Sequence, residues 1–195
     1  MEWILASASP RRKELLAELI KKFDVQPAKG EEKIEDISPK LLVQSLAKQK
    51  AKEISALEGS KGKLVLGSDT VVVLDNEVLG KPKDAADAIR MLTGLSNRSH
   101  HVYTGVCIML TTDEGVRYWQ EAADTEVVFE KLSQEQIEAY VATGSPMDKA
   151  GAYGIQDGGL VKEIKGSFSN VVGLPLELLK SMLVKIGEEL GENLL

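Results

Sequence analysis

The sequence predicts one α/β domain over residues 1–195, with a mixed twisted sheet flanked by helices. Strand patterns alternate with amphipathic helical patterns along the chain, as is typical of α/β proteins. Two hairpin signals, at Asp75-Asn76 and at Asp113-Glu114-Gly115, interrupt this alternation, so we do not expect a purely parallel sheet. A chain of 195 residues is long enough to bury a sizeable core in a single domain.

The first half of the chain predicts alternating strands and helices, with a strand at 3–6, a helix at 10–22, a helix from Ser38-Pro39 and a strand at 64–74. Ser9 is a good N-cap for the first helix, and Pro10 suits the first helical position, where no backbone N–H is needed. An extended acidic segment separates the two helices. Near-continuous apolar residues in the last strand indicate burial on both of its faces.

The second half predicts a short partner strand ending at Gly80, a helix capped by Asp84 and stopped by Gly94, strands at 100–112 and 116–130, a helix ending near Gly144, a strand at 160–164 and a helix from Pro175. Ser133 and Gln136 form a capping box at the start of the helix that ends near Gly144. The segment 145–159 is rich in glycine, and we expect it to be irregular.

Composition and charge narrow the classes of partner that we expect. The net charge of −6 at pH 7 disfavours non-specific adhesion to DNA or membranes, but it is compatible with a local basic pocket. Cys107 is the only cysteine, so a disulfide framework is absent and a reducing cytoplasm is the expected compartment. Glu2 and Trp3 stand where a secretion signal has basic residues, and no apolar run reaches membrane-spanning length. We therefore expect neither stable nucleic-acid binding nor membrane insertion.

The segment 6–16 is typical of an anion-binding helix start. Ser7, Ser9, Arg11 and Arg12 lie beside a helix N-terminus, whose free N–H groups and partial positive charge favour phosphate. Cations in the first turn of a helix oppose its dipole, so their presence here calls for a reason. The alternative interpretation is an ordinary capped helix with a solvated first turn.

Asp69 interrupts the apolar run of the strand at 64–74. An ionised carboxylate in such surroundings is costly unless a metal or a cation compensates it. The alternative is an aspartate that bonds turn N–H groups after Gly67-Ser68, but a simple turn does not need to interrupt a central strand. We favour a functional role, because carboxylates in unusual environments cluster at functional sites.

Other charged residues are less informative when each is taken alone. Lys81, Glu32 and Lys50 are individually better explained as solvent-exposed charges. The glycines of the segment 148–156 permit a ligand to approach the backbone, and its charged and amide side chains offer recognition. A mobile surface loop is the alternative for that segment.

The sequence offers few soft metal ligands. With two histidines and one cysteine, a metal is expected to be Mg²⁺ or Mn²⁺ on oxygen ligands instead of zinc. His100 and His101 are neighbours on a predicted strand, so at most one of them points into any given site. No Ser-His-Asp or Cys-His arrangement suggests covalent catalysis.

Several short motifs stand in a fixed order along nearly the whole chain. They are Ser7-Ala8-Ser9-Pro10-Arg11-Arg12, Glu32, Leu46-Ala47-Lys48-Gln49-Lys50-Ala51, Gly67-Ser68-Asp69-Thr70, Gly80-Lys81-Pro82, Ser99-His100 with Thr104-Gly105, Asp148-Lys149-Ala150-Gly151-Ala152-Tyr153-Gly154-Ile155-Gln156 and Gly173-Leu174-Pro175. Each motif alone is weak, but their order is very specific. In this order the chain resembles the Maf family of nucleoside triphosphate pyrophosphatases, once described as septum formation inhibitors.

The resemblance implies a two-lobed, inosine-triphosphatase-like α/β fold with the active site in a cleft. It also implies a hydrolase that uses a divalent metal, Mg²⁺ or Mn²⁺, to convert a nucleoside triphosphate and water into the monophosphate and pyrophosphate. By motif position, Asp69 matches the family's proton acceptor, and Asp69 and Glu32 are the expected metal ligands. The remaining matches are the charged active-site positions Glu32, Lys50 and Lys81, and the phosphate-binding positions Ser7, Ser9 and Arg11.

Three positions match the family's substrate-specificity positions. Arg12, Thr70 and Gln156 form the combination of the branch that resembles dTTP/UTP pyrophosphatases. The Gln156 amide can pair with a carbonyl and the adjacent N3–H of a pyrimidine, but a flipped amide would accept cytosine. A donor-only partner such as Arg12 would favour a carbonyl over an amino group; phosphate binding by Arg12 is the alternative.

We therefore predict in-line attack of water on the α-phosphorus, with Asp69 as general base. The metal would neutralise developing charge, and Arg11, Lys50 and Lys81 would stabilise the leaving pyrophosphate. A non-catalytic nucleotide-binding regulator of cell division and a metal-dependent phosphatase are the alternative functions. The family also suggests a homodimer.

Overall fold

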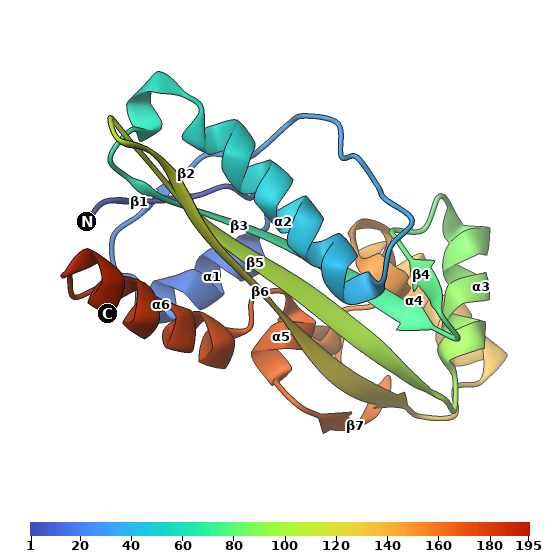
Figure 1. Ribbon diagram of the computed structural model, residues 1–195. Helices are drawn as coiled ribbons and strands as arrows, with labels where there is room; N and C mark the ends of the chain where they lie inside the picture. Colours follow the sequence, from blue (N-terminus) through green and yellow to red (C-terminus); the bar gives the residue numbers. More distant parts are fainter.

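A mixed sheet is the framework of the structure, a computed structural model that describes residues 1–195 (Figure 1). The sheet has seven strands in the order β2-β1-β3-β5-β6-β7, and β4 also pairs with β3. β1 is parallel to β2 and β3, whereas all other pairs are antiparallel. The expected mixed α/β architecture is confirmed. The strands are β1 Trp3–Leu5, β2 Asp24–Val25, β3 Leu64–Leu74, β4 Glu77–Leu79, β5 Ser99–Thr112, β6 Gly115–Phe129 and β7 Val161–Lys165.

The long central strand β3 is paired differently along its two edges. One edge pairs with β5 over residues 64–73. The other edge pairs with β1 over residues 64–66 and with β4 over residues 72–74. Residues 67–71 therefore have no partner strand on this edge, and the sheet has a gap in its middle. Asp69 and Thr70, both predicted site residues, lie at this gap.

Helices cover both faces of the sheet. On one face, α2 contributes Ala51 to a core with Val65. On the opposite face, Leu16 of α1 and Leu183 of α6 pack with Leu66 (Figure 1). The helices are α1 Pro10–Leu19, α2 Pro39–Ser55, α3 Ala85–Leu95, α4 Gln134–Ala142, α5 Phe168–Val172 and α6 Leu176–Leu190. None of them is both long enough and apolar enough to span a membrane.

The face opposite α2 holds two separate apolar cores. One core surrounds Leu66 together with α1 and α6, and the other surrounds Val72 together with α3 and α4. Between the two cores, β3 and β5 present the polar side chains of Ser68, Thr70 and Thr104. This polar strip separates two lobes and coincides with the gap along the edge of β3.

Helix α2 lies close to the sheet because two glycines face it. A Cβ on Gly67 would lie 2.2 Å from the carbonyl oxygen of Ala47, and a Cβ on Gly105 would lie 2.1 Å from that of Val43. Neither position can carry a side chain unless the helix moves away. The two glycines thus set the height of α2 above β3 and β5.

Two helix ends differ from the sequence-based prediction, and one helix was not predicted. α1 ends at Leu19 because Ile20, which was expected to be helical, is extended and buried. Gly94 was expected to stop α3, but the helix continues to Leu95, whose complete burial outweighs the low helix propensity of glycine. Asn97, with a φ of 58°, follows the end of this helix. The short helix α5 lies in a region with no helical periodicity in the sequence.

Replacing Gly67 or Gly105 with alanine should lower the free energy of unfolding by about 3 kcal/mol, because the added methyl group meets backbone that cannot rotate away. Gly94→Ala is the matched control, since its Cβ would lie at an ordinary 3.5 Å from the side chain of Leu74. Alanine there should stabilise the helix by about 0.5–1 kcal/mol. Urea unfolding measures both effects, and unchanged stability of Gly67→Ala would contradict the close approach of α2.

Candidate active site

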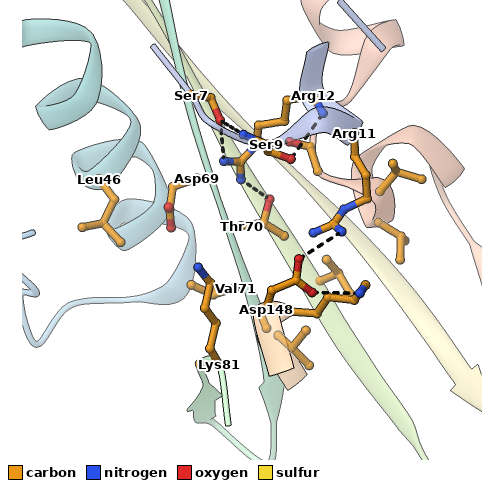
Figure 2. Close-up of a pocket in the computed structure, with 18 of the residues that line it drawn as sticks. Ser7, Ser9, Arg11, Arg12, Leu46, Asp69, Thr70, Val71, Lys81 and Asp148 are labelled. Atoms are coloured by element: carbon orange, nitrogen blue, oxygen red, sulfur yellow. Dashed lines mark hydrogen bonds and ion pairs between the residues drawn. The ribbon is translucent and has the colours of Figure 1, made fainter. Parts of the chain in front are cut away.

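A cavity of about 710 Å³ opens at the gap in the sheet, and both lobes contribute to its lining. Figure 2 shows the start of α1, the middle of β3 and Lys81 arranged around it. The fold therefore brings together residues that are far apart in the sequence. The lining includes every predicted site residue, namely Ser7, Ser9, Arg11, Arg12, Glu32, Lys50, Asp69, Thr70, Lys81 and Gln156.

The start of α1 has the geometry expected of a capped helix. Ser9 Oγ accepts a hydrogen bond from the N–H of Arg12 at 3.4 Å, and Pro10 occupies the first turn. Ser7 Oγ accepts from the N–H of Ser9 at 3.2 Å. No acidic residue lies in the first turn, so the helix N-terminus presents a positive potential to the cavity.

Lys50 joins two carboxylates at the other side of β3. Its ammonium group bonds to Asp69 Oδ1 and lies 2.9 Å from Glu32 Oε1. The side chains of Asp69 and Lys50 are only 13% and 18% exposed. The Lys50 ammonium group thus compensates the charge of the buried Asp69 carboxylate, as the apolar surroundings of this carboxylate require. The interpretation of Lys50 as a solvent-exposed lysine is wrong, because the close approach of α2 turns it toward the sheet.

The segment that carries Glu32, which we call the strap (residues 29–35), is held against α2 by side chains of that helix. Glu53 accepts the backbone N–H groups of residues 29–30 at 2.8 and 3.0 Å, and these bonds lower the pKa of Glu53. The Gln49 amide accepts from the N–H of Lys33 at 2.9 Å and donates to its carbonyl at 3.0 Å. The strap therefore has a fixed path past Lys50.

At the edge of the cavity, the Arg12 side chain donates hydrogen bonds to other segments of the protein. Its Nε donates to the carbonyl of Gly173 at 2.8 Å, and its Nη2 donates to Thr70 Oγ1 at 3.0 Å. Removal of the guanidinium from water lowers the pKa of Arg12, and the nearby charge of Asp69 opposes this shift. These bonds connect α1, β3 and Gly173, the residue that follows α5. Contact between Arg12 and a nucleobase stays a prediction.

Arg11 and Lys81 approach the cavity from different elements. Arg11 Nη1 lies 3.9 Å from the carboxylate of Asp148, whose side chain is 68% exposed, so this ion pair is weak. Figure 2 shows the ammonium group of Lys81 directed toward Asp69. Both cations are therefore placed to meet an anionic ligand.

Gln156 lies in an irregular loop that Tyr140 holds in place. The Tyr140 hydroxyl donates to Asp157 Oδ2 at 2.6 Å and accepts from the N–H of Gly154 at 3.0 Å. Ser145 Oγ also donates to Asp157 Oδ2, at 2.7 Å. These bonds fix the chain on both sides of Gln156, whose own side chain is exposed.

Sequence reasoning gave no role to the residues that hold the predicted site residues in place, although two of them, Gln49 and Thr104, lie within the quoted motifs. These residues are Gln49, Glu53, Thr104, Tyr140, Asp157 and Asn170. Gln49 and Glu53 lie one helical turn apart on α2, and this spacing is a signal that could have indicated a polar helix face. The other residues act through contacts between distant segments, which leave no local pattern.

The carboxylates of Asp69 and Glu32 suit a metal ion that binds together with the phosphates of a substrate. No group of three or more His, Cys, Asp or Glu side chains is placed to hold a metal ion. Asp69 and Glu32 nevertheless converge on one side of the cavity, where both contact Lys50. Mg²⁺ is usually bound by one or two carboxylates together with substrate phosphates. The two oxygen donors suit that mode of binding and do not suit a complete protein-only metal site.

Comparison with known proteins identifies the family. The family described as Maf-like protein matches residues 2–186. The chain belongs to the Maf-like family. A dTTP/UTP pyrophosphatase from Moorella thermoacetica is 49% identical to the Maf-like chain, with 94% of each chain covered. A dTTP/UTP pyrophosphatase from Citrifermentans bemidjiense is 50% identical, with 89% of each chain covered. A solved dITP/XTP pyrophosphatase from Mycobacterium abscessus is 16% identical, covers 68% of this chain and 76% of its own, and has a TM-score of 0.43, too low to support any conclusion.

The two histidines of the Maf-like chain have opposite environments. His100 is buried, and its Nε2 lies 2.8 Å from the hydroxyl of Tyr153, which lines the cavity. Burial lowers the pKa of His100 to about 4. His101 is exposed and bonds to Asp124 at 2.8 Å. The prediction that the two side chains lie on opposite faces of the strand is confirmed.

His100 should make the protein less stable in mild acid. An unfolded histidine takes up a proton near pH 6.5, whereas folded His100 does so only near its pKa of about 4. The unfolded state therefore binds more protons between these two values. The contribution of neutral His100 is complete above pH 6.5 and is lost as the pH falls, by about 2 kcal/mol at pH 5.

Urea unfolding at pH 7 and at pH 5 checks this expectation. His100→Gln should lose less stability between the two pH values than the parent protein does. His101→Gln is the control and should keep most of the loss, because burial is the largest cause of the lowered pKa of His100 and the charge of His101 is the smaller one. Equal losses in all three proteins would contradict the assignment of the acid sensitivity to His100.

Proposed function

We propose that this Maf-like protein hydrolyses dTTP and UTP to the nucleoside monophosphate and pyrophosphate. The observation that carries the proposal is the single cavity in which a helix N-terminus, several cations and two carboxylates face one another. These are the groups that a reaction at a triphosphate requires. The names of relatives at 49% and 50% identity support dTTP and UTP as the substrates.

Asp69 is the proposed general base for the water that attacks the α-phosphorus. Its Oδ1 is bonded to the ammonium group of Lys50, so Oδ2 is the oxygen that would accept the proton. Lys50 thereby holds the Asp69 carboxylate through Oδ1 and leaves Oδ2 outside this ion pair. Glu32 contacts the same ammonium group and completes the acidic side of the cavity.

The cationic side of the cavity is proposed to bind the phosphates. Ser7, Ser9 and Arg11 at the start of α1 would contact the leaving pyrophosphate, with Lys81 on the other side. Their attraction strengthens as negative charge develops on the leaving oxygen. A divalent cation, Mg²⁺ or Mn²⁺, held by Asp69 and Glu32 together with the phosphates, would supply further neutralisation of this charge.

Thr70 and Gln156 are proposed to contact the pyrimidine base. Both line the cavity; Gln156 can donate an amide N–H to a ring carbonyl, and Thr70 is proposed to face the adjacent N–H. Arg12 is proposed to act on specificity through Thr70, because its Nε and Nη2 already bond to Gly173 and Thr70. This role stands beside the direct contact between Arg12 and the base, which stays a prediction.

No feature of the cavity favours a non-catalytic regulator of cell division or a phosphatase that releases orthophosphate. A regulator would not need a carboxylate oriented by a buried lysine beside the phosphate-binding groups. A homodimer is proposed on the family resemblance alone, and a cytoplasmic location is proposed on the single cysteine of the sequence.

Asp69→Asn should reduce hydrolysis of dTTP by roughly 10²–10⁴-fold, because an amide cannot accept the proton of the attacking water. The fold should remain, since the amide oxygen still accepts from Lys50. Asp113→Asn, at an exposed turn where the carboxylate pairs only with Lys61, is the matched control and should retain full activity. Hydrolysis of dTTP by folded Asp69→Asn at the parent rate would exclude Asp69 as the base.

The identity of the released anion tests the reaction itself. Incubation of the protein with dTTP or UTP and Mg²⁺ should release pyrophosphate and the monophosphate, and a chelator should stop the release. Orthophosphate as the first product would indicate a phosphatase. Nucleotide binding with no product, across a panel of nucleotides, would indicate the regulator.

A further inference from the structure

A chain of hydrogen bonds crosses the polar strip behind the cavity. It runs from Arg12 to Thr70 at 3.0 Å, from Thr70 to Thr104 at 3.0 Å, and from Thr104 to the backbone carbonyl of Asn170 at 2.9 Å. Thr104 and Asn170 are completely buried, with 0% of their surface exposed. Water therefore cannot supply alternative partners to the inner end of this chain.

The two ends of the chain determine the direction of each hydrogen bond. A guanidinium group only donates, and a backbone carbonyl only accepts. Thr104 has a single hydroxyl hydrogen, which it donates to the carbonyl of Asn170. Thr104 must then accept from Thr70, so the Thr70 hydroxyl donates to Thr104 and accepts from Arg12.

Thr70 consequently has one lone pair left for a ligand in the cavity that it lines. A free threonine hydroxyl rotates and can either donate or accept, so it cannot distinguish a ring N–H from a ring nitrogen. Gln156 has the same ambiguity, because its amide can be flipped. Of the two residues proposed to contact the base, only Thr70 is fixed by the protein as a hydrogen-bond acceptor toward the ligand.

We propose that Thr104 is a positioning residue that determines base specificity by holding Thr70 as a hydrogen-bond acceptor. Uracil and thymine carry a hydrogen at ring position 3 and can donate to Thr70. Cytosine has a lone pair at that position, which would oppose the lone pair of Thr70. This inference rests on the proposed function, because its ligand is the pyrimidine nucleotide of that reaction.

Thr104→Val tests the inference, because valine has nearly the shape of threonine but cannot accept a hydrogen bond. The Thr70 hydroxyl would then be free to donate to the ring nitrogen of cytosine. The ratio of kcat/KM for UTP to kcat/KM for CTP should fall roughly tenfold, chiefly through a lower KM for CTP. Thr104→Ser keeps the hydroxyl and should restore the ratio of the parent.

Thr125→Val is the matched control. Thr125 is also buried, and it also bonds to Asn170, accepting from its Nδ2 at 2.9 Å, but it does not bond to Thr70. Its valine variant should lose stability and keep the UTP/CTP ratio. If Thr104→Val does not fold, Thr104→Ala removes the same hydroxyl with less crowding and takes its place.

The outcomes separate this inference from the proposed function. A folded Thr104→Val or Thr104→Ala protein with the parent UTP/CTP ratio, or an equal change in Thr125→Val, would overturn the role of Thr104 and leave the pyrophosphatase activity intact. A parent protein that releases no pyrophosphate from UTP would overturn the proposed function itself. A lower ratio in Thr104→Val alone, restored in Thr104→Ser, supports the inference.

Discussion

The packing of α2 directly onto Gly67 and Gly105 is the contact on which the rest of the site depends. Because the helix backbone touches the strand backbones, a lysine on α2 can reach a carboxylate on β3. The same helix supports the strap through Gln49 and Glu53, so Glu32 also takes its position from this contact. A larger residue at either glycine would move the helix and separate the groups that it brings together.

Strand β3 contributes side chains from both of its faces to the lining of the cavity. Successive side chains of a strand point in opposite directions, so Asp69 meets Lys50 of α2 while Thr70 meets Arg12 of α1. A complete sheet would keep two such neighbours apart. Here the edge of β3 has no partner at residues 67–71, and one ligand can contact both sides of the strand. The proposed proton transfer and the proposed base recognition thus fall on adjacent residues with separate supporting contacts.

Much of the fold could be predicted because its signals are local. The caps at Ser9 and Ser133 and the continuous apolar strand β3 depend on neighbouring residues, and all are present. The end of α3 could not be predicted, because the burial of Leu95 in the second core outweighs the glycine before it. Burial of this kind is decided by segments that are distant in the sequence.

In the candidate site, too, some features follow from local sequence and others depend on contacts between distant segments. Its members could be named from motifs, but the inward orientation of Lys50 follows from how closely α2 approaches the sheet, which no local pattern encodes. Thr104 and Asn170 are 66 positions apart, and only the folded chain brings them into contact. The sequence therefore indicates which residues line the cavity more readily than which residues hold them in place.

The gap in the sheet also bears on how the protein avoids aggregation. An unpaired strand edge offers its backbone groups to strands of other molecules and can begin the growth of larger sheets. Here the open stretch at residues 67–71 is short, and β1 and β4 close it at both ends. Arg11 and Lys81 stand beside it and add the charges that discourage strand pairing. A short opening flanked by cations thus leaves a cavity beside β3 and disfavours pairing with a strand of a second polypeptide.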